Sequence, residues 1–131
     1  AMSTNYTVVI QPSAERHYFK NFSRKYKSAW DTTWRAIGEE LRRFDSLLAT
    51  TIAEVITCSG NIRIAKIEFR VAGARESRKT SGNRCIVAVH QDIGVVKLLL
   101  IYHKSDLGDG IETAKWKQII KDNYSDYRGM L

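Results

Sequence analysis

The sequence contains little of what many functional classes require. Its 131 residues include two cysteines, one proline and eight glycines. Two cysteines are too few for a disulfide framework or a cysteine-rich metal site, and we expect both thiols to be reduced. So little proline and glycine excludes collagen-like and low-complexity chains, and a hydrophobic fraction of 44% excludes intrinsic disorder. We therefore expect one globular domain over residues 1–131.

Long apolar runs are also missing. The longest, Val95–Tyr102, has eight residues and is interrupted by Lys97, whereas a membrane span needs roughly 20. The first five residues carry neither positive charge nor an apolar stretch, so no secretory signal is expected there. These features predict a cytoplasmic protein with no membrane partner.

The sequence lacks the motifs of several enzyme classes. The three histidines, His17, His90 and His103, are scattered, and no HxxxH or CxxC pair would place two ligands on one metal. The glycine patterns of dinucleotide-binding and triphosphate-binding loops do not occur, nor does the GxSxG motif of esterases. We therefore expect neither a metal site nor a cofactor.

Charge is the most informative property of the composition. The chain has 21 lysines and arginines against 14 aspartates and glutamates, a net charge of +7. Residues 62–90 hold seven of the basic and two of the acidic residues, whereas residues 91–131 hold six of each. An excess confined to one region is typical of a surface that meets a polyanion, although an ordinary solvated basic face would show the same charge.

The hydrophobic pattern predicts an α+β fold with the element order β-α-α-β-β-β-α. Strands are predicted at 6–10, 62–71, 84–89 and 95–102. Helices are predicted to begin near Pro12, to carry the apolar stripe Trp30–Leu48, and to span about 111–124. The alternation of apolar residues slips near Ala65, which indicates a β-bulge. We expect a helical hairpin and a C-terminal helix packed on a mainly antiparallel twisted sheet, with 95–102 at its centre.

The two helices of the predicted hairpin each carry aromatic residues at helical spacing. In the first helix, Tyr18, Phe22 and Tyr26 recur every four residues, and basic residues occupy another face. The tryptophans and phenylalanine of the second helix have the spacing that burial against a core demands. We interpret that aromatic stripe as core packing rather than as a ligand site.

A polar loop between two predicted strands, residues 70–84, carries most of the candidate binding residues. Five of its 15 residues are basic and one is acidic. Arg70 ends one strand and Arg84 opens the next, so we expect both at the same end of the sheet, where Lys104 follows the strand 95–102. Basic groups around one groove bind phosphate oxygens and stabilise the charge that develops during phosphate chemistry. The predicted phosphate- or RNA-binding residues are Arg70, Arg75, Arg78 and Lys79.

Metal-independent RNA cleavage also requires groups that move protons. The ribose 2′-hydroxyl attacks the neighbouring phosphorus, and a base and an acid must assist it. His103 is one candidate because imidazole titrates near neutrality, although a lone histidine at the end of a strand is more often structural.

Three segments resemble the RelE/ParE superfamily of type II toxins, particularly its HigB-like branch. These segments are Lys66-Ile-Glu-Phe-Arg70, Lys79-Thr-Ser-Gly-Asn-Arg84 and Leu98-Leu-Leu-Ile-Tyr-His-Lys-Ser-Asp106. They follow, approximately and in the same order, the K-x-R, S-G-x-R and L-L-x-x-Y-x-K segments of that family. The resemblance covers residues 62–124, and it extends to the helical hairpin by architecture alone.

The resemblance implies a RelE-like fold and the toxin of a bacterial toxin–antitoxin system. Such a toxin is a ribosome-dependent endoribonuclease that cuts mRNA and is neutralised by an antitoxin protein. By position, Arg84 matches the arginine that contacts the scissile phosphate, Lys104 matches the lysine after the central strand, and Arg70 and Lys79 match residues of the RNA groove. An arginine at the edge of a strand is not expected in the core, so Arg84→Ala should leave the fold intact.

The sequence departs from the ribonuclease pattern after Lys104. Ser105 stands where some ribonuclease members carry an arginine, and no tyrosine occurs between Lys104 and Tyr124. The general acid and base are therefore not assigned by the resemblance. Three alternatives stay open: an endoribonuclease, an inhibitor of DNA gyrase like the ParE members, and a non-toxic homologue. Whether the chain forms a homodimer is also open.

Overall fold

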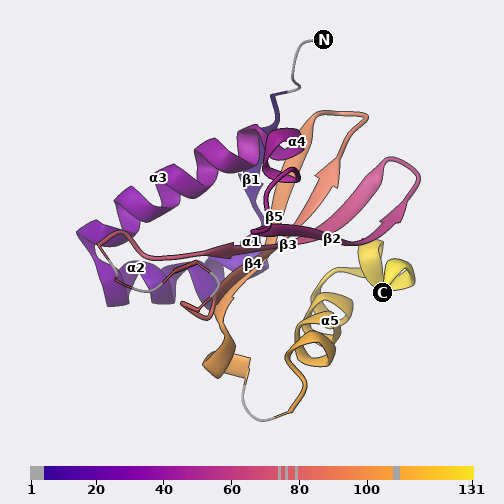
Figure 1. Ribbon diagram of the computed structural model, residues 1–131. Helices are drawn as coiled ribbons and strands as arrows, with labels where there is room; N and C mark the ends of the chain where they lie inside the picture. Colours follow the sequence, from indigo (N-terminus) through magenta and orange to yellow (C-terminus); the bar gives the residue numbers. More distant parts are fainter. Residues whose placement is uncertain (1–4, 74, 76, 79, 108–109) are drawn as a thin grey trace.

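The computed structural model describes residues 5–73, 75, 77–78, 80–107 and 110–131 and has an α+β fold (Figure 1). Its strands are β1 (Thr7–Ile10), β2 (Ala53–Ser59), β3 (Ile62–Phe69), β4 (Asn83–His90) and β5 (Val95–His103). They form one sheet in the order β1-β5-β4-β3-β2. β1 runs parallel to β5 and the other pairs are antiparallel, which confirms the prediction of a mainly antiparallel sheet.

β2 is a strand that the sequence pattern does not predict. It lies at the edge of the sheet, and its side chains are exposed or half-buried without regular alternation. The irregularity predicted near Ala65 lies in β2, where the pairing shifts between Val55 and Thr57, opposite Ile64 and Ala65. In β3 itself, Ile64 and Ala65 are both buried because they belong to cores on opposite faces of the sheet. This two-sided burial explains why the alternation slips there.

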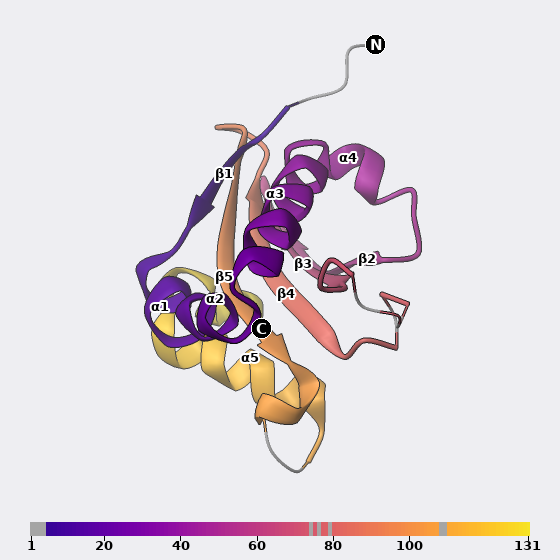
Figure 2. The same cartoon turned by 90° about the vertical axis from the view of Figure 1, so that its left-hand side faces the viewer.

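The first face of the sheet is covered by the helical hairpin, which lies in front of the sheet in Figure 2. α1 (Pro12–Ala14), the π-helical turn η1 (Glu15–Phe19) and α2 (Lys20–Tyr26) follow one another without a break, and α3 (Ser28–Arg42) and α4 (Phe44–Leu47) come next. The chain turns at Lys27, where φ is 51°, and α2 and α3 form a V in Figure 1. Phe22 and Trp30 place their ring centroids 5.9 and 6.1 Å from that of Phe69. These contacts confirm that the aromatic stripe of α3 packs in the core.

The second face is covered by α5 (Glu112–Asn123) and the 3₁₀ helix η3 (Ser125–Met130). Trp116 and Ile120 of α5 form a second buried core with Ile86 and Leu100 of the sheet. Because both faces are covered, β4 and β5 are buried along most of their length. β5 is thus an interior strand, as predicted, but the middle position of the sheet belongs to β4. None of the helices in the described part of the chain has the length and hydrophobicity that crossing a membrane requires.

His90 joins the end of β4 to the C-terminal 3₁₀ helix. Its Nε2 lies 2.8 Å from the hydroxyl of Tyr127. Burial, reinforced by the positive charge of Lys97, lowers the pKa of His90 from its ordinary value of 6.5. The unfolded chain therefore takes up a proton at His90 more readily than the folded protein does. The resulting contribution of His90 to the free energy of unfolding is fully present above the pKa that His90 has in the unfolded chain. This contribution is lost as the pH falls from that value toward the lower pKa that His90 has in the folded protein.

We therefore expect the melting temperature to fall between about pH 7.5 and pH 5.5, with part of the decrease due to His90. In a His90→Gln variant the decrease should be smaller, because glutamine does not titrate. Melting curves of both proteins across this pH range measure the difference. Parallel pH profiles of the two proteins would contradict the role assigned to His90.

Candidate functional site

Three strands meet at the end of the sheet where the sequence places its candidate residues. Asn83 of β4 pairs with His103 of β5, and Arg84 pairs with Tyr102. The backbone N–H of Lys104 donates to the Gly82 carbonyl oxygen at 2.8 Å. Arg70 directly follows β3, which pairs with β4 at the same end. The strand pairing therefore brings Arg70, Arg84, His103 and Lys104 to one end of the sheet.

Arg84 and His103 lie on opposite faces of that sheet end. Arg84 lies two residues before Ile86 on β4, so the two side chains share the face that α5 covers. His103 lies two residues after Ile101 on β5, so it shares the face that the helical hairpin covers. Successive residues of a strand point to opposite faces. Because Arg84 pairs with Tyr102 rather than with His103, these two of the three predicted catalytic side chains are separated by the sheet.

Arg84 is buried, contrary to the expectation from its place at the start of a strand. Only 8% of the residue is exposed. Its Nη1 donates to the Asn83 carbonyl oxygen at 3.0 Å, and its Nε lies 4.0 Å from Oε1 of Glu68. Beside it, the Tyr102 hydroxyl donates to Oε2 of Glu112 at 2.7 Å, and burial together with this hydrogen bond raises the pKa of Tyr102. The start of α5 closes this side of the sheet, and the expectation that Arg84 lies outside the core is therefore wrong.

Arg78 fixes the loop between β3 and β4 to α3. Both of its terminal nitrogens donate to the carboxylate of Glu40, Nη1 at 2.8 Å, and these hydrogen bonds raise the pKa of Arg78. A second anchor is Thr33, whose Oγ1 accepts the Ala72 backbone N–H at 2.7 Å. The guanidinium predicted to bind phosphate is thus engaged by a carboxylate of the same protein.

The remaining predicted cations differ in their placement. Arg70, Arg75 and Lys104 are exposed, and within the described residues their side chains form no ion pair. Lys104 opens the 3₁₀ helix η2 (Lys104–Leu107) directly after β5. Lys79 lies outside the described residues. Among the predicted cations that the structure describes, the exposed ones at this end of the sheet are therefore Arg70, Arg75 and Lys104.

The Ser81-Gly82 turn holds the start of β4 against His103. The Ser81 hydroxyl donates to the Phe69 carbonyl oxygen at 2.6 Å and accepts the Asn83 backbone N–H at 3.1 Å. Gly82 has a φ of +81°, and a Cβ on it would lie 2.6 Å from Nε2 of His103. Glycine is required here both for its backbone conformation and for the close approach of the imidazole.

Gly82→Ala should therefore destabilise the protein more than the same change at Gly73. Both glycines have positive φ, but a Cβ at Gly73 meets nothing within 4 Å. The difference between the two variants isolates the contact with His103, for which we expect about 1–3 kcal/mol of additional loss in the free energy of unfolding. Chemical denaturation of the two variants measures it. Equal losses would mean that His103 moves aside without cost.

His103 has hydrogen-bond partners at both ring nitrogens. Nε2 lies 3.0 Å from the Ser81 carbonyl oxygen, and Nδ1 lies 3.1 Å from the Ser105 backbone nitrogen and 2.7 Å from the Ser105 hydroxyl. A carbonyl oxygen only accepts and a backbone N–H only donates. We therefore assign the ring proton to Nε2 and a lone pair to Nδ1, with the Ser105 hydroxyl as the second donor to that lone pair. Nδ1 is thus the atom of His103 that can accept a proton.

A cavity of about 300 Å³ adjoins His103 on the side of the hairpin, and we call it the aromatic pocket. It is lined by His17, Tyr18, Asn21, Phe22, Lys25, Tyr26, His103 and Asp106. The Asp106 carboxylate accepts the His103 backbone N–H at 3.0 Å. Burial, together with the charge of Asp106, raises the pKa of Tyr18. The sequence pattern shows Tyr18 and Tyr26 only as parts of an apolar stripe and does not indicate this pocket.

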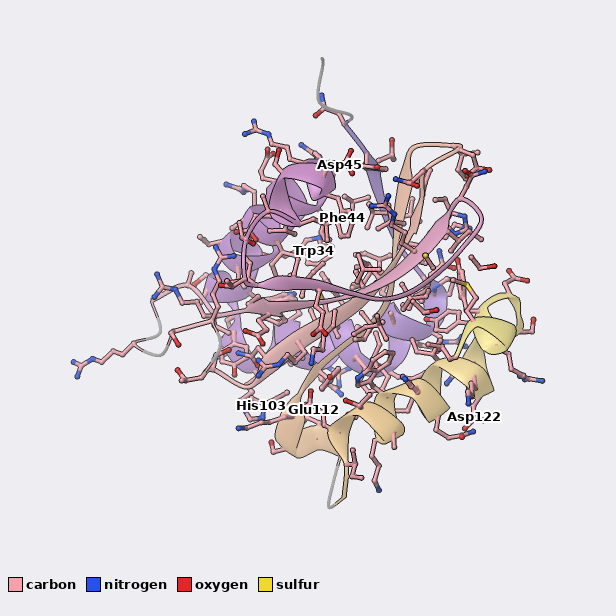
Figure 3. All side chains as sticks on the ribbon, turned by 45° about the vertical axis from the view of Figure 1, so that its right-hand side comes forward. Trp34, Phe44, Asp45, His103, Glu112 and Asp122 are labelled. Carbon is pink, nitrogen blue, oxygen red and sulfur yellow. The ribbon has the colours of Figure 1, made fainter. Side chains whose placement is uncertain are left out.

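Figure 3 places His103 and Glu112 at the same end of the molecule, near the start of α5. Among the described residues, no three histidine, cysteine, aspartate or glutamate side chains converge as metal ligands do. Comparisons with known proteins found no matching family model, no matching curated protein and no matching solved structure. These comparisons therefore assign neither a family nor a function to the chain.

Proposed function

We propose that the protein is the toxin of a bacterial toxin–antitoxin system, an endoribonuclease that cuts mRNA on the ribosome. The observation that carries this proposal is the placement of the His103 imidazole, whose Nε2 lies 3.0 Å from the Ser81 carbonyl oxygen and whose Nδ1 lies 3.1 Å from the Ser105 backbone nitrogen. The exposed Lys104 follows it directly. The resemblance to RelE/ParE toxins supplies the reaction and the substrate. The RelE-like fold is part of the proposal: the predicted elements occur in the expected order, and β2 is an additional strand.

In the proposed reaction, the ribose 2′-hydroxyl displaces both Ser105 donors, the hydroxyl and the backbone N–H, from Nδ1 of His103. Nδ1 removes the proton as the 2′-oxygen bonds to phosphorus, and Nε2 keeps its hydrogen bond to Ser81, which fixes the orientation of the ring. The bond from phosphorus to the 5′-oxygen breaks, leaving a 2′,3′-cyclic phosphate. The 5′-oxygen takes up a proton from solvent water, and His103 afterwards releases to water the proton that it removed from the 2′-hydroxyl. Lys104 compensates the negative charge that develops on the phosphoryl oxygens.

The buried and paired cations have positioning roles in this proposal. Arg84 secures the start of β4 from the opposite face of the sheet, and Arg78 secures the loop that carries Arg70 and Arg75. The exposed Arg70 and Arg75 contact the RNA backbone on either side of the cleavage point. The antitoxin would cover the same basic surface with an acidic or amphipathic segment, because opposite charges favour such a contact.

Primer extension on an mRNA translated in a bacterial extract tests the proposal. The protein should create new 5′ ends that require ribosomes, and Lys104→Gln should reduce them about 100-fold, the effect of removing one charge-stabilising group. Lys20→Gln is the matched control, since Lys20 is exposed on the hairpin and does not line the aromatic pocket. Intact mRNA in the presence of folded protein would contradict the proposal.

A second candidate is a non-enzymatic inhibitor of DNA gyrase, like the ParE toxins. The ion pair of Arg78 with Glu40 and the burial of Arg84 beside Glu68 favour it. One cation predicted to bind RNA and one predicted to contact the scissile phosphate serve the fold instead. This function predicts loss of supercoiling activity when the protein is added to gyrase. Normal supercoiling together with ribosome-dependent mRNA cleavage would exclude it.

A further inference from the structure

The aromatic pocket has flat apolar walls on the hairpin side. The rings of Phe22 and Tyr26 are stacked, with centroids 5.9 Å apart and an interplanar angle of 30°. Tyr18 and Tyr26 are half-buried, and Phe22 forms the buried part of the lining. A volume of about 300 Å³ lies at the lower end of the range for small-molecule sites. A single planar ring fits such a space better than a peptide or a flexible chain does.

Polar groups converge on the same cavity. Asn21 lines the cavity and donates from Nδ2 to the His17 carbonyl oxygen at 3.0 Å. The Lys25 ammonium lies 5.3 Å from the centroid of the Tyr26 ring. Asp106 contributes a carboxylate from the opposite wall. Aromatic walls with a few fixed polar groups and a cation are the features that bind the unstacked bases of single-stranded RNA.

The backbone of the hairpin is irregular where it borders this pocket. In η1 the Lys20 N–H reaches the Glu15 carbonyl oxygen, five residues earlier, and the π-helical turn contains both His17 and Tyr18. Such turns inside α-helices are rare and occur frequently at functional sites. The turn is an observation independent of the cavity, and both point to the same surface.

We propose that the aromatic pocket binds one nucleobase of RNA and prefers guanine. This inference rests on the proposed function and adds a base-recognition site next to His103 and Lys104. Tyr26 and Tyr18 provide the stacking surfaces. The Asp106 carboxylate only accepts hydrogen bonds, and guanine presents two adjacent donors, N1–H and N2–H₂, to such a group. Uracil presents a single N–H donor and binds less tightly. The enzyme therefore cuts next to a guanine in preference to a uracil.

Titration of the wild-type protein with 5′-GMP, 5′-UMP and ribose 5-phosphate, followed by NMR, tests the pocket directly. We expect 5′-GMP to shift the ring resonances of Tyr18 and Tyr26 and to bind about tenfold more tightly than 5′-UMP. Ribose 5-phosphate should leave these resonances unchanged, because it lacks a base. Equal shifts with ribose 5-phosphate, or no shift with any nucleotide, would overturn the proposal.

Three variants separate base binding from folding. Tyr26→Phe keeps the stacking surface and should bind 5′-GMP like the wild type, whereas Tyr26→Leu should bind it about tenfold more weakly. Asp106→Asn keeps an acceptor for the His103 N–H and should remove the preference for 5′-GMP over 5′-UMP. Melting curves verify that each variant is folded. A preserved preference in folded Asp106→Asn would overturn the assignment of guanine.

The outcomes distinguish this inference from the proposed function. Selective binding of 5′-GMP by a protein that leaves mRNA intact would support the pocket and contradict the endoribonuclease. Cleavage of mRNA at unchanged positions by Asp106→Asn and Tyr26→Leu would support the endoribonuclease and overturn the pocket.

Discussion

Replacing His103 with glutamine should lower the rate of mRNA cleavage by about 10²–10⁴-fold, the usual contribution of a general base. Glutamine can still donate a hydrogen bond to the Ser81 carbonyl oxygen, but it has no lone pair of comparable basicity at the position of Nδ1. The protein should therefore remain folded while proton removal from the 2′-hydroxyl is lost. Single-turnover cleavage of ribosome-bound mRNA, with the protein in excess, measures the chemical step.

The matched control is His90→Gln. His90 lies at the opposite end of β4 and contacts Tyr127, so its loss removes an imidazole without affecting the site. Measured above pH 7, where the stability contributed by His90 is retained, this variant should cleave at the wild-type rate. Wild-type cleavage by a folded His103→Gln protein would show that another group accepts the proton.

The parts of the fold that follow from the sequence are those with strong apolar periodicity. β5, α3 and α5 are predicted because their buried residues recur at regular intervals, and burial is a direct cause of that pattern. β2 is not predicted because an edge strand buries few side chains and its pairing is interrupted after Val55. An interior strand can therefore be predicted from its apolar composition. An edge strand forms because it pairs with a neighbouring strand, and the sequence does not identify that neighbour.

Less of the candidate site than of the fold can be predicted from the sequence. The sequence predicts that Arg70, Arg84 and Lys104 lie at one end of the sheet, and the strand pairing places them there. The sequence does not contain the register of β4 against β5. The register pairs Arg84 with Tyr102, and a shift of one residue would place Arg84 and His103 on the same face. Similarly, the partner of Arg78 is Glu40, which lies 38 residues earlier on another element. Pairings of this kind arise from tertiary packing, and no local motif reports them.

The sequence pattern does not predict the aromatic pocket, and the reason is different. Spacing by four residues predicts that Tyr18, Phe22 and Tyr26 share one face, and they do line one cavity. The pattern gives no information about depth of burial, and it assumes a regular α-helix. The π-helical turn at Glu15–Phe19 breaks that assumption at one end of the stripe. The only signal in the sequence was that two members of this stripe are tyrosines, whose hydroxyls favour half-buried positions.

Arg84→Ala should lower the free energy of unfolding by about 3 kcal/mol, because it removes a buried cation and leaves the Glu68 carboxylate without a nearby opposite charge. The side chains of Arg84 and Glu68 are 10% and 17% exposed, so water compensates for little of this loss. In a domain of this size the melting temperature should fall by about 10 °C. Thermal and chemical denaturation measure both quantities. A change below about 1 kcal/mol would show that the Arg84 charge contributes little to the fold.

The companion variant removes both charges at once. Replacing Arg84 with methionine and Glu68 with glutamine keeps the volume at this end of the sheet and leaves no buried charge, so it should recover most of the stability lost in Arg84→Ala. This double variant makes the role of Arg84 in cleavage measurable apart from its role in folding. Loss of cleavage in the stable double variant would support the phosphate contact that the RelE/ParE resemblance implies. Retained cleavage would assign Arg84 to the fold, as its burial on the face opposite His103 leads us to expect.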